Sequence, residues 1–237
     1  MSTVWALGDY HRFATTLIWH FGTELVGDTG IEPGMRVLNV ATGSGNVALR
    51  AAQRGASVTA LDLEPAQLER GRAVAGGLSI EWVEGDAQDL PFADATFDVV
   101  TFAAGAIFAP DHEATARELQ RVTRPGGTIG MINFTPEGLA ADFFAVFAPY
   151  LPAGPSPTDW GSEAYVTRLF AGCELALERR SYVEEPPGGF AEFYKATFGP
   201  AVAIDDPAFE RDLSAFAERA GELRFEYLRL LVHRPPA

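Results

Sequence analysis

Two glycines, Gly43 and Gly45, stand between an apolar run that ends at Val40 and a stretch of helical character that begins at Asn46. Glycine allows a positive φ and lets a ligand touch the bare backbone. A helix that starts there would aim its free N–H groups and its positive dipole end at the same spot. Such a turn binds an anionic group, either a pyrophosphate or the carboxylate of an amino acid. The pattern Gly-x-Gly-x-x-Ala also fits the dinucleotide fingerprint, so the turn alone leaves both ligands open.

Two acidic residues follow the next predicted strands, where their side chains would reach a bound nucleoside. Asp62 ends the second strand, and a carboxylate there can accept hydrogen bonds from both hydroxyls of a ribose. Glu64 precedes Pro65 and is better placed to cap the following helix, which leaves Asp62 for the ribose. Asp86 follows the third strand and can accept a hydrogen bond from the exocyclic amine of adenine. The carboxyl ends of parallel strands meet at one edge of a sheet, so these residues should face one crevice.

Removal of a proton from an acceptor would need a general base, and the candidates lie outside these motifs. Tyr10 and His11 begin the first predicted helix, and His112 follows the fourth strand at the edge of the crevice. We predict these three residues as catalytic groups or contacts. His20 lies next to aromatic residues and His233 lies in the final strand, so a structural role is expected for both.

Aromatic side chains are candidates for the wall of a substrate pocket, because pockets for small ligands are mostly apolar. The expected substrate contacts are Phe13, Trp19 and Trp160, and Trp160 follows a loop rich in proline (152–157) of the kind that acts as a lid. Further aromatic candidates, each of which can equally be ordinary core, are Phe102, Phe108, Phe134, Phe143, Phe144 and Phe147.

Short strands that alternate with helices would position these residues. Apolar and β-branched runs predict five strands, at Arg36–Val40, Ser57–Leu61, Ile80–Glu84, Phe97–Phe102 and Thr128–Phe134. The helices predicted between them are Asn46–Arg54, Pro65–Ala75 and Asp111–Thr123. This alternation implies right-handed βαβ units, and therefore an α/β fold in which a parallel sheet carries helices on both faces.

Both ends of the chain add to this sheet. Apolar residues at three- and four-residue steps predict a helix over Asp9–Val26, capped by Asp9. After the fifth strand, Thr135 is expected to cap a helix with Pro136 at its first position. The elements predicted beyond that point are helices at Ser162–Phe170, Phe190–Phe198 and Pro207–Ala220, and strands at Cys173–Val183 and Arg224–His233. We interpret them as the far edge of the same sheet with covering helices.

Composition excludes several classes of partner. The 237 residues suit one domain, and 32 acidic against 18 basic side chains give a formal charge of −14. A surface that negative repels phosphate backbones and anionic lipids, so neither nucleic acid nor a membrane is expected as a partner. Cys173 is the single cysteine and the four histidines are scattered, which argues against a metal site. We see no signal peptide and no apolar run of the ~20 residues that a membrane helix needs, and expect a cytoplasmic protein.

Five short motifs, taken in order, resemble a known family. They are Val-Leu-x-Val-Ala-x-Gly-x-Gly (37–45), Leu-Asp-Leu-x-Pro (61–65), Gly-Asp-Ala-x-x-Leu-Pro-Phe (85–92), Phe-Asp-Val-Val (97–100) and Arg-Pro-Gly-Gly (124–127). Together they resemble the class I S-adenosylmethionine-dependent methyltransferases, in their small-molecule, ubiquinone/menaquinone C-methyltransferase-like branch. The resemblance is strong from about Gly8 to Pro136 and weak beyond it.

The resemblance implies a Rossmann-like sheet of seven strands, the last antiparallel, with S-adenosylmethionine as cofactor. It implies that the glycine turn lines the methionyl part, that Asp62 binds the ribose, and that the end of the fourth strand lies near the sulfonium. The full set of cofactor contacts expected on this basis is Asn39, Ala41, Gly43, Gly45, Asp62, Leu63, Asp86, Ala87 and Phe102. The family usually has Asp where this chain has Asn39, and we expect that change to weaken contact with the methionyl amino group modestly.

The expected activity is transfer of a methyl group from S-adenosylmethionine to an O, N or C atom of a small metabolite. The chain would be a single methyltransferase domain, with a helical cap (1–30), a cofactor-binding half (31–135) and a substrate-side half with helical insertions (136–237). Two alternatives stay open: a protein of the same fold that binds the cofactor without methyl transfer, such as a cyclase or a regulatory subunit, and a nicotinamide-dependent oxidoreductase. The segment 85–92 and the long helix before the first strand argue against the oxidoreductase.

Overall fold

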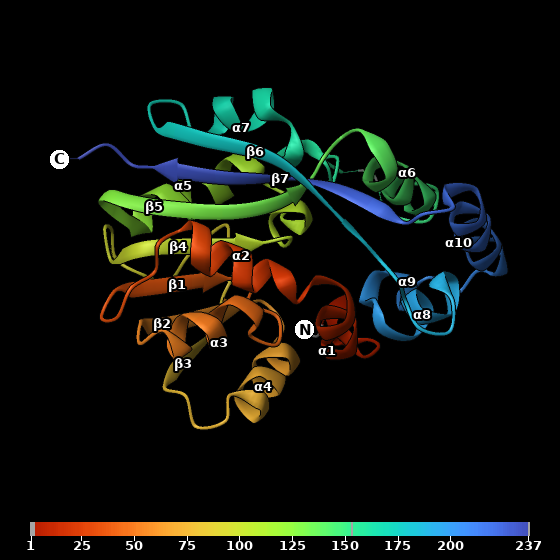
Figure 1. Cartoon of the computed structure of the whole chain (residues 1–237), viewed down its shortest axis with the longest axis horizontal. Helices are drawn as coiled ribbons and strands as arrows, with labels where there is room; N and C mark the ends of the chain where they lie inside the picture. Colours follow the sequence, from red (N-terminus) through yellow and green to blue (C-terminus); the bar gives the residue numbers. More distant parts are fainter. Residues whose placement is uncertain (1–2, 153, 237) are drawn as a thin grey trace.

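A seven-stranded sheet with the order β3-β2-β1-β4-β5-β7-β6 runs through the computed structural model, which describes residues 3–152 and 154–236 (Figure 1). The strands are β1 (Arg36–Val40), β2 (Ser57–Asp62), β3 (Ile80–Glu84), β4 (Phe97–Ala103), β5 (Thr123–Phe134), β6 (Glu174–Val183) and β7 (Arg224–His233). Strands β1 to β5 pair in parallel, whereas β7 is antiparallel to both of its neighbours, β5 and β6. The predicted α/β fold, with seven strands and an antiparallel last strand, is therefore confirmed.

Helices cover both faces of this sheet. They are α1 (Tyr10–Phe13), α2 (His20–Asp28), α3 (Asn46–Gln53), α4 (Pro65–Val74), α5 (His112–Val122), α6 (Gly138–Phe147), α7 (Glu163–Leu169), α8 (Phe190–Thr197), α9 (Gly199–Ala203) and α10 (Pro207–Ala220). Adjacent residues of a strand point to opposite faces, so each central strand feeds two cores. On β1, Val37 packs into a core with α2 and α3, whereas Leu38 packs into a second core with α5 and α7. Among the described residues, every helix is too short or too polar to span a bilayer.

The N-terminal helical segment is interrupted where the sequence predicts one continuous helix. Asp9 caps α1 as expected, because the N–H of Arg12 donates to Asp9 Oδ1 at 3.0 Å. A π-helical segment, η2 (Ala14–Ile18), then separates α1 from α2. The side chain of Asn46 donates to the carbonyl of Ile18 at 2.9 Å and thereby satisfies one backbone group at the end of this segment. A π-turn changes the helix phase, so α1 and α2 can present their apolar residues to different surroundings.

In the C-terminal part the predicted start of one helix is wrong, and one short helix is missed. Helix α6 begins at Gly138 rather than at Pro136, because Thr135 is still held by β7: its backbone N–H and its hydroxyl both donate to the carbonyl of Glu226, at 3.3 Å. The short helix α9 is not predicted at all. The loop expected at 152–157 includes residue 153, which lies outside the described residues.

A third layer lies beyond the carboxyl ends of the parallel strands. Figure 1 shows α1, α8 and α9 gathered at that end of the sheet, with α6 and α10 beside them. Aromatic rings hold this layer together: Phe13 of α1 lies 5.3 Å from Tyr194 and 5.0 Å from Phe198, and Phe143 of α6 lies 5.1 Å from Tyr194 (centroid distances). The layer therefore encloses the sheet edge at which the predicted site residues end.

Candidate active site

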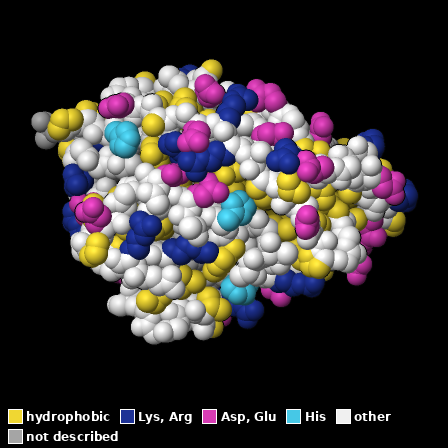
Figure 2. Space-filling model, in the orientation of Figure 1, with side chains coloured by type: hydrophobic (Ala, Val, Ile, Leu, Met, Phe, Trp, Pro, Cys, Tyr) yellow, Lys and Arg dark blue, Asp and Glu magenta, His cyan; other side chains and the backbone are white. Residues whose placement is uncertain are grey.

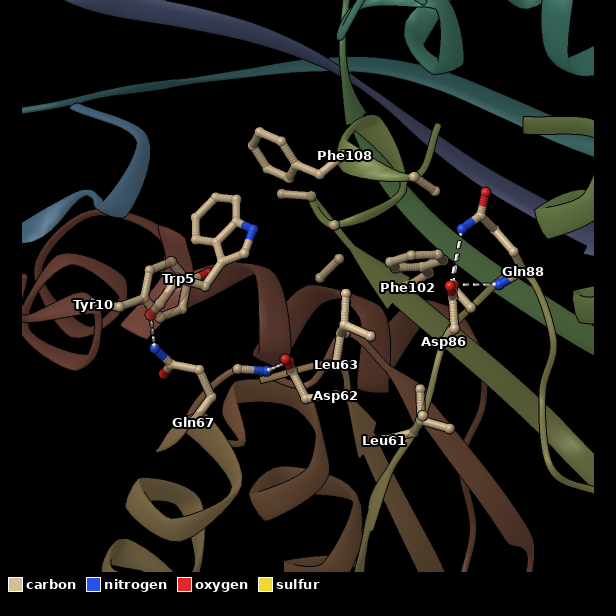
Figure 3. Close-up of a pocket in the computed structure, with 18 of the residues that line it drawn as sticks. Trp5, Tyr10, Leu61, Asp62, Leu63, Gln67, Asp86, Gln88, Phe102 and Phe108 are labelled. Atoms are coloured by element: carbon tan, nitrogen blue, oxygen red, sulfur yellow. Dashed lines mark hydrogen bonds between the residues drawn. The ribbon is translucent and has the colours of Figure 1, made fainter. Parts of the chain in front are cut away.

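A pocket of about 790 Å³, partly open to solvent, lies at the carboxyl edge of the parallel strands (Figure 3). Seven of the predicted cofactor contacts and one predicted catalytic residue line it: Ala41, Gly43, Asp62, Leu63, Asp86, Ala87, Phe102 and Tyr10. In Figure 3, Trp5 and Tyr10 stand on one side of the pocket, Asp86 and Gln88 on the other, and Asp62 and Leu63 between them. Residues from five separate segments of the chain thus meet around one space, as the sequence predicts.

The glycine turn closes one side of this pocket by backbone contacts. Gly43 and Gly45 both have positive φ, +54° and +95°. A Cβ on Gly43 would lie 2.8 Å from Cε1 of Tyr10, so glycine is required for the ring to approach the turn. A Cβ on Gly45 would instead meet the ring of Trp82 at 2.9 Å, and Gly45 does not line the pocket. Gly43 is therefore the glycine that shapes the pocket, while Gly45 lets α3 pack against the sheet.

Asp62 ends β2 with both carboxylate oxygens engaged by the backbone. The N–H of Gly43 donates to Oδ2 at 2.7 Å, and the N–H of Glu64 donates to Oδ1 at 3.0 Å. Burial raises the pKa of Asp62, and these N–H donors oppose that rise by stabilising the anion. Each carboxylate oxygen has a further lone pair, so Asp62 can still accept hydrogen bonds from a ligand. Glu64 caps α4 as predicted, because the N–H of Ala66 donates to its side chain.

Asp86 is held in place by Gln88, which is not among the site residues predicted from the sequence. The side-chain amide of Gln88 donates to both oxygens of Asp86 at 3.0 Å, and its carbonyl oxygen accepts from the N–H of Asp111 at 2.8 Å. Gln88 thereby ties the segment after β3 to the start of α5. Leu63, which is 52% exposed, offers an apolar surface between Asp62 and Asp86 in the same pocket.

Asn39 is buried and does not line the larger pocket. Its Oδ1 accepts from the hydroxyl of Thr42 at 2.7 Å, and its Nδ2 lies 3.4 Å from the carbonyl of Thr101, to which it donates. It lines a smaller cavity of about 360 Å³ next to the glycine turn. A carboxylate at this buried position could not donate to the Thr101 carbonyl, so the amide suits this network better than the Asp that the family usually carries.

Trp5, near the N-terminus, lines the pocket and is not among the site residues predicted from the sequence. The carbonyl of Trp5 accepts a hydrogen bond from the side chain of Gln67 at 2.7 Å, which anchors the N-terminal segment to α4. The indole ring packs edge-on against Tyr10, Phe108 and Phe198, at centroid distances of 5.7, 4.5 and 5.5 Å. The signal that the sequence offers for this contact is a large aromatic side chain, Trp5, shortly before a predicted helix.

Tyr10 lies at the junction of the pocket with a second cavity. It lines both spaces, and its ring stacks on Phe13 at 5.7 Å. Burial, together with the charge of Asp62, raises the pKa of Tyr10 well above its ordinary value. The phenol therefore stays protonated at neutral pH, where it is a hydrogen-bond donor and not a general base.

His11 and Trp19, expected as catalytic residue and substrate contact, lie outside the pockets. Nδ1 of His11 shares a hydrogen bond of 2.8 Å with Oγ of Ser44, so His11 connects α1 to the glycine turn. Trp19 lies 5.9 Å from His11 and has the guanidinium of Arg50 over its ring at 5.0 Å. Both predictions of direct contact need correction, because neither His11 of α1 nor Trp19, which lies between η2 and α2, lines the pocket that Tyr10 faces.

His112 and Trp160 are interior residues. Trp160 is 0% exposed and belongs to the core under α5 and α7, which contradicts its expected place in a lid. His112 packs 5.3 Å from this indole, and its Nδ1 shares a hydrogen bond of 2.9 Å with the hydroxyl of Tyr165. Burial lowers the pKa of His112, and the residue lines neither pocket. The sequence places both residues near the crevice edge but does not show that they point into the core beneath it.

The second cavity, of about 470 Å³, is the most aromatic space next to the cofactor-sized pocket. It shares Trp5, Tyr10, Ala104 and Phe108 with that pocket. Its remaining lining residues are Phe13, Ile18, Ile107, Phe134, Phe143, Phe144, Tyr182, Glu184, Tyr194, Phe198 and Phe225. They come from α1, η2, η3 (Ala106–Phe108), β5, α6, β6, α8, β7 and the segments between these elements. Of the expected substrate contacts, Phe13 lies on this wall.

A single carboxylate, Glu184, lies on this aromatic wall. It is 4% exposed, and its two oxygens accept hydrogen bonds of 2.8 Å from the hydroxyls of Tyr182 and Tyr194. Burial raises the pKa of Glu184 to about 7, although the two hydroxyls act in the opposite direction. The sequence gives no sign of this burial, because Glu184 stands in a Glu-Glu-Pro-Pro run that is typical of an exposed loop.

The chain is similar to known methyltransferases in sequence. Residues 38–131 match the family model of a methyltransferase domain. An uncharacterised protein of Mycobacterium bovis is 41% identical over 98% of this chain and 93% of its own length, and the demethylmenaquinone methyltransferase of Thermus thermophilus is 42% identical over 43% of this chain and 48% of its own.

A solved structure shows the same fold over most of the chain. The crystal structure of a putative methyltransferase from Bacillus halodurans superimposes with a TM-score of 0.67 at 22% identity, covering 90% of this chain and 98% of that one. The pocket offers a glycine turn, a carboxylate, an apolar platform and a second carboxylate side by side, which suit the amino-acid tail, ribose and adenine of S-adenosylmethionine. The chain therefore belongs to the S-adenosylmethionine-dependent methyltransferases and transfers a methyl group from that cofactor.

Proposed function

We propose that S-adenosylmethionine lies in the larger pocket with its ribose on Asp62 and its adenine against Leu63. In this arrangement Asp86 and Ala87 meet the edge of the adenine, and the methionyl part follows Ala41 and the glycine turn. Phe102 and the end of β4 then lie near the sulfonium, and Asn39 acts through Thr42. The observation that carries this assignment is that Ala41 and Gly43, Asp62 and Leu63, Asp86 and Ala87, and Phe102, from four segments of the chain, line one pocket.

The cofactor, when bound, supplies an electrophilic methyl group, so the protein has to align the acceptor and exclude water. An attacking atom has to be held about 3–3.5 Å from the reacting carbon. Trp5 and Tyr10 stand between the pocket and the aromatic cavity and line both. We assign to them the positioning of the acceptor against the methyl group, with the Tyr10 hydroxyl as a donor to either ligand.

The acceptor that we propose is a small, largely aromatic molecule bound in the aromatic cavity. The aromatic wall of this cavity supports a ring compound over a sugar or a free amino acid. One relative is named a demethylmenaquinone methyltransferase, which supports a quinone-like ring as the acceptor class. The methylated atom can be O, N or C under this proposal.

Charge supports a small acceptor and not nucleic acid. The formal charge is −14, and acidic side chains are interspersed with the Lys and Arg on the face drawn in Figure 2. We further propose that the protein works in the cytoplasm and that residues 1–237 form a single domain, with 1–30 as cap, 31–135 as cofactor-binding half and 136–237 as acceptor-binding half.

The cofactor assignment is tested by differential stabilisation. A ligand at a hundredfold its Kd stabilises the folded state by about 2.7 kcal/mol, which corresponds to a rise in melting temperature of roughly 5–10 °C for a chain of this size. We expect this rise with S-adenosylmethionine and S-adenosylhomocysteine, and none with NAD. Mass spectrometry of ligands released from freshly purified protein gives an independent readout. Stabilisation by NAD and by neither adenosyl compound would overturn the proposal.

A further inference from the structure

The carboxylate of Glu184 is placed where an acceptor would bind and has hydrogen-bonding capacity left over. It follows β6, and its own N–H donates to the carbonyl of Leu223 at 2.9 Å, so its backbone is fixed. A carboxylate offers about four lone-pair sites, and the hydroxyls of Tyr182 and Tyr194 occupy two. The remaining sites can accept a proton donor from a ligand in the cavity.

No cation compensates this charge among the described residues that line the cavity. The other titratable side chains on the wall are Tyr10, Tyr182 and Tyr194, and His20 of α2 lies behind Tyr182 with a centroid distance of 4.8 Å. Burial and the nearby Glu184 raise the pKa of both Tyr182 and Tyr194 well above the ordinary value, so both stay protonated and keep donating. Burial of a carboxylate without a cation is costly, and a structure that needed only packing would place an apolar side chain here.

We propose that Glu184 is the general base of the methyl transfer and that the acceptor is a hydroxylated aromatic ring whose O–H points at this carboxylate. This inference rests on the proposed function and adds the reacting group. The O–H bond of the acceptor breaks and its proton moves to Glu184. The oxygen's electron pair forms the bond to the methyl carbon, the carbon–sulfur bond breaks, and its electron pair stays on the sulfur of the departing S-adenosylhomocysteine. Glu184 returns the proton to water when the product leaves.

The pKa of Glu184 suits the role of a general base. A general base works best when its pKa lies near the working pH, and burial raises the pKa of Glu184 to about 7. Tyr182 and Tyr194 hold the carboxylate in one orientation, so they act as positioning residues. Removal of the Tyr182 hydroxyl should raise the pKa of Glu184 further, because that hydrogen bond favours the anion.

Binding of a matched pair of probes tests the inference without any turnover. The pair is 2-naphthol and its methyl ether, 2-methoxynaphthalene, titrated by calorimetry into the protein saturated with S-adenosylhomocysteine. Hydrogen bonds to charged groups favour binding by roughly ten- to a hundredfold. The wild type should prefer the naphthol by that factor at pH 8.5, and the preference should shrink at pH 5.5, where Glu184 is protonated. Glu184→Gln, which keeps the side-chain shape, should abolish the preference at pH 8.5.

Glu185→Gln is the matched control, since it makes the same chemical change at the next, exposed position and should keep the preference. Tyr182→Phe should move the pH at which the preference is lost to a higher value. An infrared pH titration should show a carboxyl group that titrates near pH 7 in the wild type and is missing from Glu184→Gln. An unchanged preference in Glu184→Gln, or no binding of either probe, would overturn the inference. Failure of S-adenosylhomocysteine to bind would instead overturn the cofactor assignment, so the two failures are distinguishable.

Discussion

Substitution of Asp62 by Ala is the most direct test of the cofactor site. The carboxylate accepts hydrogen bonds from the N–H of Gly43 at 2.7 Å and from that of Glu64 at 3.0 Å, and Asp62 lines the pocket. Loss of one hydrogen bond from a ribose hydroxyl to a charged group costs about 1.5–3 kcal/mol, which raises the Kd for S-adenosylmethionine roughly ten- to a hundredfold. Calorimetry with S-adenosylmethionine and S-adenosylhomocysteine measures this change directly.

The same substitution also loosens the glycine turn, and the two effects can be separated. Asp62→Ala leaves two backbone N–H groups without their acceptor, which lowers the melting temperature of the ligand-free protein by roughly 2–4 °C for each kcal/mol lost. Asp62→Asn should bind almost as poorly, because its NH2 group would face one of these two donors. Asp89→Ala, at an exposed position of the segment after β3, should leave both quantities unchanged. A lowered melting temperature with an unchanged Kd would show that Asp62 only supports the turn, and the ribose assignment would be refuted.

Three further predictions follow from contacts described above. Gly43→Ala should raise the Kd for S-adenosylmethionine by about tenfold, a loss of about 1.4 kcal/mol in binding free energy, because its Cβ would displace the ring of Tyr10 that lines the pocket. Gly76→Ala carries the same backbone strain, with φ of +59°, but has no neighbour within 4 Å, so it should leave calorimetric binding unchanged. Equal effects of the two changes on the Kd would contradict the close contact. His112→Ala should lower the melting temperature without changing the Kd for S-adenosylmethionine or for 2-naphthol, because this side chain packs against Trp160 in the interior. An unchanged melting temperature together with weaker binding of either ligand would contradict this structural role. Finally, the pKa of Glu184 is raised by burial from 4.5 to about 7, so the folded state holds its proton over a pH range in which the unfolded chain releases it. The contribution of this group to folding stability therefore falls by about 3 kcal/mol as the pH rises from about 4.5 to 7. Denaturant titrations at pH 4.5 and 7.5 should show this loss in the wild type and not in Glu184→Gln. Parallel stability curves for the two proteins would contradict the raised pKa.

The sequence predicts the central sheet closely because local patterns and turn chemistry agree there. The bounds of β1, β3 and β7 match the prediction to the residue, since each is an apolar or β-branched run between polar or glycine-containing turns. The glycine turn and the acids at the ends of β2 and β3 likewise follow from chain order, because parallel strands bring their carboxyl ends to one edge. These features explain why most of the cofactor pocket could be predicted.

Residues outside the motifs are harder to place, since their surroundings come from distant parts of the chain. His112 and Trp160 follow β4 and the proline-rich loop, and nothing in either segment shows that the side chains pack together in a core. Glu184 is buried among residues that include Tyr194, which comes from a helix later in the chain and donates a hydrogen bond to it. A carboxylate beside two prolines has the composition of a loop, so tertiary contact and not local sequence decides its burial.

The two cavities are built from different parts of the chain, and this division bears on what the relatives share. The methyltransferase-domain match, residues 38–131, contains the pocket residues from Ala41 to Pro110 but not Trp5 and Tyr10, and it ends before Phe134, Glu184 and Tyr194 of the aromatic wall. Relatives that align only with this half therefore share the source of the methyl group, and their acceptors need not be the same. The Mycobacterium bovis protein aligns over 98% of the chain and so spans the segments that form the aromatic wall. If it carries a carboxylate and tyrosines in the positions of Glu184, Tyr182 and Tyr194, the two proteins should select the same class of acceptor, a ring with an ionisable hydroxyl.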